Sequence, residues 1–131
     1  MTTITVPDGL AWVGVSLLST AFLLQWQSIG VSLARVKAKV DYPRMYATKE
    51  EQEASKEAMV FNCKQRAHQN TLEGLTTLYL TAAITAVQYP KFSAAMTGLW
   101  TLSRVFYTIG YSTGSPAKVR SFLPAREGYL C

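Results

Sequence analysis

The chain has 131 residues, a formal net charge of +5, and a composition that is 49% hydrophobic and 16% charged. Its length allows one domain, covering residues 1–131. Eight of its thirteen Lys and Arg residues lie between Arg35 and Arg66, between two apolar segments, rather than in a basic stripe interleaved with aromatic residues. This distribution argues against nucleic-acid binding. A single histidine and no metal-ligand spacing of cysteines predict no metal site.

The first apolar segment runs from about Leu10 to Ala34 and is long enough to cross a hydrocarbon core of roughly 30 Å. No basic leader precedes it, and it is longer than the apolar region of a signal peptide, so it predicts a retained transmembrane helix. The polar notch Gln25-Trp26-Gln27-Ser28 interrupts it. Because unpaired amides that face lipid are costly, this notch is predicted to face other helices.

The middle of the chain is polar. Pro43 prevents one uninterrupted helix, and the mixed charges of residues 49–57 predict a solvated loop or a short surface helix. Two further membrane helices are predicted at about 61–89 and 92–111, joined by a tight turn at Tyr89-Pro90. Such a short connection makes consecutive helices antiparallel. The predicted fold is therefore an all-α integral membrane bundle with three transmembrane helices.

The placement of basic residues predicts an orientation. The loop after the first helix is rich in Lys and Arg, and the tail carries Lys118, Arg120 and Arg126, whereas the turn near Pro90 has only Lys91. By the positive-inside rule, the first loop and the tail are expected to be cytoplasmic. The N-terminus and the turn near Pro90 are then lumenal.

Each predicted membrane helix carries polar side chains in its cytoplasmic half. At helical spacing they fall on one face of each helix and meet at similar depth. These residues are Arg66, Asn70 and Glu73 on the second helix, Arg104, Tyr107 and Tyr111 on the third, and Arg35 at the end of the first.

Ionisable side chains inside a membrane cost about 3 kcal/mol or more each, so they are usually paired or functional. One interpretation is a structural ion pair, Glu73 with Arg104 or with Arg66, that locks the bundle. The other begins from the charge count, because the arginines outnumber the single carboxylate. Surplus positive charge predicts an anionic ligand.

Three stretches carry a family resemblance: ARVKAKVDYPRMYAT, FNCKQRAHQNTLE and LSRVFYTIGYSTGSPAK. They resemble the membrane-associated proteins in eicosanoid and glutathione metabolism, and are most similar to the type-3 microsomal glutathione S-transferases. The similarity extends from the first helix to about Lys118. It implies a homotrimer of four-helix subunits, with glutathione as co-substrate bound between neighbouring subunits near the cytoplasmic face. It also implies residence in the endoplasmic reticulum or the mitochondrial outer membrane.

The resemblance further implies roles for individual residues. The glutathione-contacting positions correspond to Arg35, Arg66, Asn70, Glu73, Arg104, Tyr107 and Tyr111. The arginine that stabilises the glutathione thiolate corresponds to Arg120, with Lys118 as the alternative. The sequence departs from the family pattern in two places. GLTT follows Glu73 where relatives carry a bulkier residue and proline, and the polar tail at 119–131 stands where the fourth helix is expected.

The resemblance implies a membrane-bound glutathione transferase and peroxidase that acts on lipophilic electrophiles or lipid hydroperoxides, in the manner of leukotriene C4 synthase. Two other functions stay open. The chain could be a non-catalytic family member with a lipid-binding or scaffold role, for which the missing helix argues. It could also be an accessory subunit of a membrane complex, whose buried charges pair with its partners.

Overall fold

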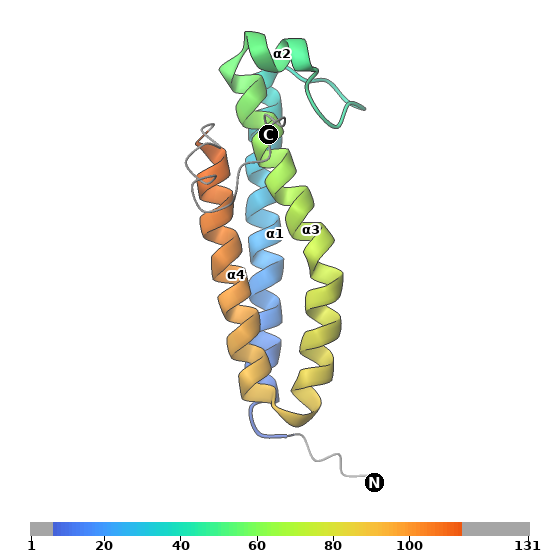
Figure 1. Ribbon diagram of the computed structural model, residues 1–131, viewed down its shortest axis with the longest axis vertical. Coiled ribbons are helices and arrows are strands. Elements are labelled where there is room, and N and C mark those ends of the chain that lie inside the picture. The colour runs from blue at the N-terminus through green and yellow to red at the C-terminus, as the bar shows by residue number, and fades with distance from the viewer. Residues whose placement is uncertain (1–6, 114–131) are drawn as a thin grey trace, which may run out of the picture.

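The computed structural model describes residues 7–113, which form a bundle of long helices with no strand among them (Figure 1). The bundle consists of α1 (Leu10–Ala38), α3 (Lys56–Gln88) and α4 (Pro90–Ser112), which run side by side. The short α2 (Lys49–Ala54) packs against α3 at one end. The all-α prediction is confirmed. The expected absence of a fourth membrane helix concerns residues 119–131, which lie outside the described part.

The predicted helix ends differ from the observed ones by about a turn, and local capping explains part of the difference. The first helix continues to Ala38, and Lys39 ends it in a left-handed conformation. The second begins at Lys56 rather than near Phe61, because the Ser55 hydroxyl accepts the N–H of Ala58 and caps the earlier start.

The charged segment after Pro43 contains a helix, as one of the two sequence alternatives expected. Thr48 and Glu51 form a reciprocal capping box at the start of α2. The Thr48 backbone N–H and the Arg44 guanidinium hold the pKa of Glu51 below its usual range. The same contacts stabilise the ionised carboxylate and, with it, the cap.

The turn between α3 and α4 is a single residue, Tyr89. Pro90 occupies the first position of α4, where its missing N–H costs nothing. The N-terminal end of α1 lies beside this turn: Gly9 adopts a φ of 97°, and a Cβ there would come within 2.8 Å of the Lys91 side chain. The start of α1 and the Pro90 turn therefore share one end of the bundle, as the predicted orientation requires.

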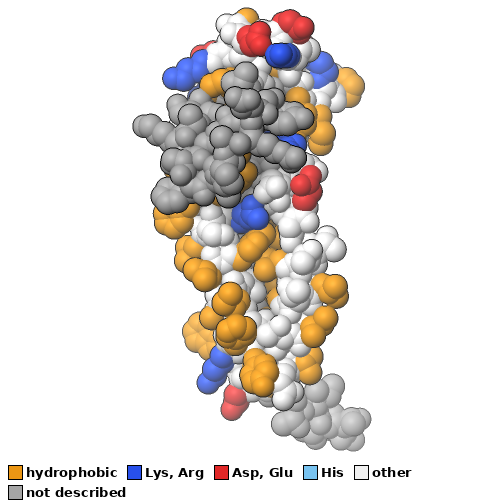
Figure 2. Space-filling model, in the orientation of Figure 1, with side chains coloured by type: hydrophobic (Ala, Val, Ile, Leu, Met, Phe, Trp, Pro, Cys, Tyr) orange, Lys and Arg blue, Asp and Glu red, His pale blue; other side chains and the backbone are white. Residues whose placement is uncertain are grey.

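The bundle exposes large apolar side chains and buries mainly small and polar ones. Large apolar side chains are exposed along the helices, and Figure 2 shows them covering much of the visible flank, with acidic side chains gathered mainly at the ends. Buried positions are instead filled largely by Ala, Ser, Thr and Gln. A water-soluble domain would expose far less contiguous apolar surface, whereas small and polar residues at helix contacts are typical of membrane bundles.

Within residues 7–113, α1 is the one helix that is both long enough and apolar enough to cross a membrane. The other two long helices have sufficient length, because 23 residues at a rise of 1.5 Å extend about 35 Å. Their more polar composition leaves transmembrane placement of α3 and α4 a prediction.

Gln27 of α1 joins the three long helices in the bundle interior. Its side chain is 3% exposed, and its amide donates to the hydroxyls of Thr71 on α3, at 3.0 Å, and Thr108 on α4, at 2.6 Å. Its carbonyl lies 3.2 Å from Nδ1 of His68. For Gln27, the prediction that the polar notch faces other helices is confirmed. Its neighbours Gln25, Trp26 and Ser28 are exposed.

Gln27→Ala should destabilise the bundle by about 2 kcal/mol, because three interhelical hydrogen bonds at roughly 0.6 kcal/mol each are lost in a membrane environment. Reversible unfolding of the detergent-solubilised protein by sodium dodecyl sulfate measures the change. The exposed neighbour provides the control: Gln25→Ala should change the free energy of unfolding by less than about 0.5 kcal/mol. Equal effects of the two substitutions would contradict a joining role for Gln27.

Candidate functional site

Arg104 projects toward α3 from the C-terminal half of α4. Its Nη1 donates to Oδ1 of Asn70 at 2.6 Å, so that two of the predicted site residues are in direct contact. The guanidinium carbon also lies 5.1 Å from the ring centre of Trp100 and 5.5 Å from that of Tyr107. Aromatic faces attract a cation electrostatically, so both rings help to fix the guanidinium.

Gly74 makes this arrangement possible on the α3 side. A Cβ at this position would lie 3.3 Å from Cζ2 of Trp100 and 3.9 Å from Nη2 of Arg104. The absence of a side chain at Gly74 leaves room for Trp100 beside α3.

Tyr107 and Tyr111 extend the same face of α4 toward its C-terminal end. Their ring centres are 4.5 Å apart and their planes are tilted by 33°. We use the name Arg104 cluster for the assembly of Asn70, Gly74, Trp100, Arg104, Tyr107 and Tyr111. The cluster combines a cation, an amide and two phenols, which suits a ligand that carries carboxylate groups.

Neither ion pair of the purely structural interpretation is present. Glu73 and Arg66 are both exposed on α3, and neither pairs with an opposite charge within residues 7–113. In the same part of the chain the ion pairs are Arg44–Glu51 and Lys49–Glu53, both outside the bundle interior. Within the described residues, Arg104 is thus held by one neutral acceptor and two aromatic rings rather than by a carboxylate.

Arg35 is not brought to the Arg104 cluster. It is 8% exposed, and its Nη1 donates to the carbonyl oxygens of Arg44, at 2.6 Å, and Val40, at 3.4 Å. Its guanidinium stacks on the rings of Tyr42 and Phe61. Arg35 therefore orders the loop at 39–47. It lies eight residues beyond the interior Gln27, which corresponds to about 12 Å along α1.

A polar opening of about 410 Å³ lies next to Arg35. Gln65 and His68 of α3 line it together with residues of α1 and the loop. Through His68 it adjoins the hydrogen-bond network of Gln27. Here the structure places polar groups that the sequence prediction assigned no role.

Trp100 was not among the site residues predicted from the sequence. The available signal was its spacing: Trp100 lies four residues before Arg104, where side chains of a helix are neighbours. Arg120 and Lys118, the two candidates for thiolate stabilisation, lie outside the described residues.

A comparison with protein families supports the resemblance found in the sequence. The sequence model of the MAPEG family, which is the family of membrane-associated proteins in eicosanoid and glutathione metabolism, matches residues 13–126. This range includes nearly all of α1, the whole of α3 and α4, and every predicted site residue. No solved structure matches the chain.

Gly74→Leu should displace Trp100 and destabilise the protein by about 1–3 kcal/mol, because the added side chain overfills the contact between α3 and α4. In a Trp12→Phe, Trp26→Phe background Trp100 is the single tryptophan, so its emission maximum and quenching by acrylamide report its burial. Gly98→Leu is the matched control, since a Cβ at Gly98 meets nothing within 4 Å. An unchanged Trp100 signal in Gly74→Leu would show that Gly74 is not needed for this packing.

Proposed function

The chain belongs to the MAPEG family, and from this membership and the Arg104 cluster we propose that it is a membrane-bound glutathione transferase and peroxidase. One observation carries the proposal. The Arg104 guanidinium is part-buried, is held by the Asn70 amide and two aromatic rings, and has no carboxylate partner within residues 7–113. A cation held in this way is available to an anionic co-substrate.

Glutathione has two carboxylates and one ammonium group, and the surroundings of the cluster offer partners for each. The planar fork of Arg104 suits bidentate binding of a carboxylate. Arg66 lies one turn before Asn70 on α3 and offers a second guanidinium. Glu73 lies three residues after Asn70 and offers a carboxylate to the ammonium group. The Tyr107 and Tyr111 hydroxyls provide further hydrogen-bond partners.

The exposure of Arg66 and Glu73 supports a site at the surface of one subunit, covered by a second subunit. We propose that the homotrimer implied by the family resemblance supplies this cover, with the site near the cytoplasmic face of the endoplasmic reticulum membrane. Arg35 is engaged by the loop carbonyls. We assign it the role of ordering residues 39–47 rather than direct contact with glutathione from the same chain.

The chemistry requires a glutathione thiolate. A thiol with a pKa of about 8.5 is only a few per cent ionised at neutral pH. Lowering that pKa by about two units requires roughly 2.7 kcal/mol of preferential thiolate stabilisation. One positioned cation in a water-poor site can supply this amount. We propose Arg120 for the role, with Lys118 as the alternative.

The thiolate then has two reactions open to it. With a lipophilic electrophile it forms a carbon–sulfur bond and expels the leaving group. With a lipid hydroperoxide it attacks the terminal oxygen, which releases the lipid alcohol and leaves glutathione sulfenic acid. A second glutathione converts the sulfenic acid to the disulfide and water. The type-3 likeness of the sequence favours both activities in one site.

Arg104→Ala should weaken glutathione binding by about 30-fold, because a charge-assisted hydrogen bond of about 2 kcal/mol is lost. Isothermal titration of the detergent-purified protein measures the dissociation constant. Arg66→Ala should weaken binding by a smaller factor, since Arg66 is exposed. The control is Arg44→Ala, which removes the same charge from the exposed pair with Glu51. If Arg104→Ala and Arg44→Ala bind glutathione alike, the cluster is not the glutathione site.

Arg120→Ala should leave glutathione affinity within about twofold but lower the rate of conjugation to chlorodinitrobenzene by about 100-fold. Thiolate absorbance in the far ultraviolet should fall in parallel. Lys118→Ala is the matched comparison and should retain most of the activity. The reverse outcome would transfer the thiolate role to Lys118. Saturable glutathione binding without thiolate formation in the unsubstituted protein would favour the non-catalytic family member.

A further inference from the structure

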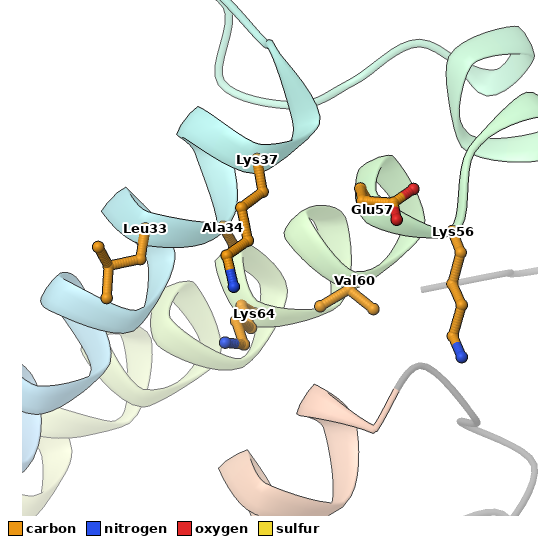
Figure 3. A pocket seen from close by; sticks show the side chains of 7 residues that line it. All are labelled: Leu33, Ala34, Lys37, Lys56, Glu57, Val60 and Lys64. Carbon is orange, nitrogen blue, oxygen red and sulfur yellow. The ribbon is translucent and has the colours of Figure 1, made fainter.

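At the loop end of the bundle, α1 and α3 line an open hollow of about 380 Å³ (Figure 3). It shares no residue with the Arg104 cluster or with the opening beside Arg35. We use the name lysine hollow for it, and its lining is Leu33, Ala34 and Lys37 of α1 with Lys56, Glu57, Val60 and Lys64 of α3.

The lysine hollow carries excess positive charge. Figure 3 shows the Lys37 side chain of α1 extending toward the position of Lys64 on α3, with Lys56 on the other side of Val60. None of the three lysines forms an ion pair within residues 7–113. The single carboxylate of the lining, Glu57, accepts a hydrogen bond from the Ser55 hydroxyl at 2.9 Å. Ammonium groups that line one hollow repel each other, so an anion bound among them lowers the electrostatic energy.

The rest of the lining is apolar. Leu33, Ala34 and Val60 provide its hydrocarbon surface, and the Leu33 side chain is 60% exposed. A small inorganic anion gains nothing from such a surface. A ligand with an anionic head and an apolar stem is complementary to both parts of the lining.

The position of the hollow identifies the source of such a ligand. It lies where the apolar α1 ends and the basic loop begins, which is the level of lipid headgroups in a membrane protein. Basic pockets between helices at this level bind the headgroups of anionic lipids. We propose that the lysine hollow binds the phosphate of an anionic phospholipid through Lys37 and Lys64, with the adjoining acyl chain on Leu33 and Val60.

The test uses the full-length protein purified in an uncharged detergent and titrated with three probes. These are short-chain phosphatidic acid, phosphatidylcholine with the same acyl chains, and inorganic phosphate. Saturable binding of phosphatidic acid is expected, with at least about tenfold weaker binding of the other two. The double variant Lys37→Gln, Lys64→Gln should weaken phosphatidic acid binding by roughly 30-fold, because each lysine near the surface contributes about a factor of five.

The matched control is Lys39→Gln, Lys49→Gln, which removes the same charge at the same end of the bundle but outside the hollow. It should leave binding nearly unchanged. Equal weakening in both double variants would overturn the proposal in favour of a general charge effect. Binding of inorganic phosphate as tight as that of phosphatidic acid would also overturn the proposal. If that binding depended on Lys37 and Lys64, the site would be assigned to a free anion.

Two further variants keep the proposal testable if the first double variant fails to fold. Lys37→Arg, Lys64→Arg preserves both charges and should retain binding within about threefold. Leu33→Ser removes part of the apolar surface while leaving every charge in place, and should weaken binding of the phospholipid but not of inorganic phosphate. Unchanged phospholipid binding in Leu33→Ser would exclude the acyl-chain contact.

Discussion

A polar atom that is buried away from water needs a hydrogen-bond partner within the protein, and this requirement determines how the helices of the bundle are joined. The Gln27 side chain satisfies it. Its amide reaches hydroxyl groups on both of the other long helices, and each hydroxyl in turn donates to a backbone carbonyl of its own helix. Thr20 on α1 follows the same pattern, donating to Leu17 while contacting the Tyr79 hydroxyl. Among the described residues, no buried side-chain nitrogen or oxygen lacks a hydrogen-bond partner. The helices are thus joined by hydrogen bonds between uncharged side chains, and each buried polar atom of these side chains has a partner.

Arg104 satisfies the same constraint in a different way. Its guanidinium is fixed by a neutral amide and by aromatic faces, which hold its position without cancelling its charge. A carboxylate partner would instead have neutralised the charge of the guanidinium. The neutral surroundings preserve the attraction of the cation for an anion from outside. The sequence left two interpretations of the charges open, a structural ion pair and an anionic ligand. The absence of a carboxylate partner of Arg104 within residues 7–113 favours the anionic ligand.

The lengths of the apolar segments were sufficient to predict the three long helices, and the tight turn at Pro90 predicted the antiparallel order of the last two. Helical periodicity predicted that the polar faces of Asn70 and Arg104 meet. Spacing along one helix could not show which aromatic ring would support Arg104, because that depends on the room that Gly74 leaves on another helix. It also could not show that Arg35 turns toward the loop. The position of Arg35 is set by carbonyl oxygens nine and five residues later in the chain, and loop conformation carries no periodic signal. The lysine hollow was missed for a related reason, since its lysines come from two helices and share no motif.

The length of α3 has a mechanical consequence. Its 33 residues extend about 50 Å, well beyond a hydrocarbon core of roughly 30 Å. If α3 crosses the membrane as predicted, this surplus lets the helix tilt more in a thin bilayer and less in a thick one. A difference in bilayer thickness is then accommodated by tilting the bundle as a whole, without rearranging the contacts between its helices.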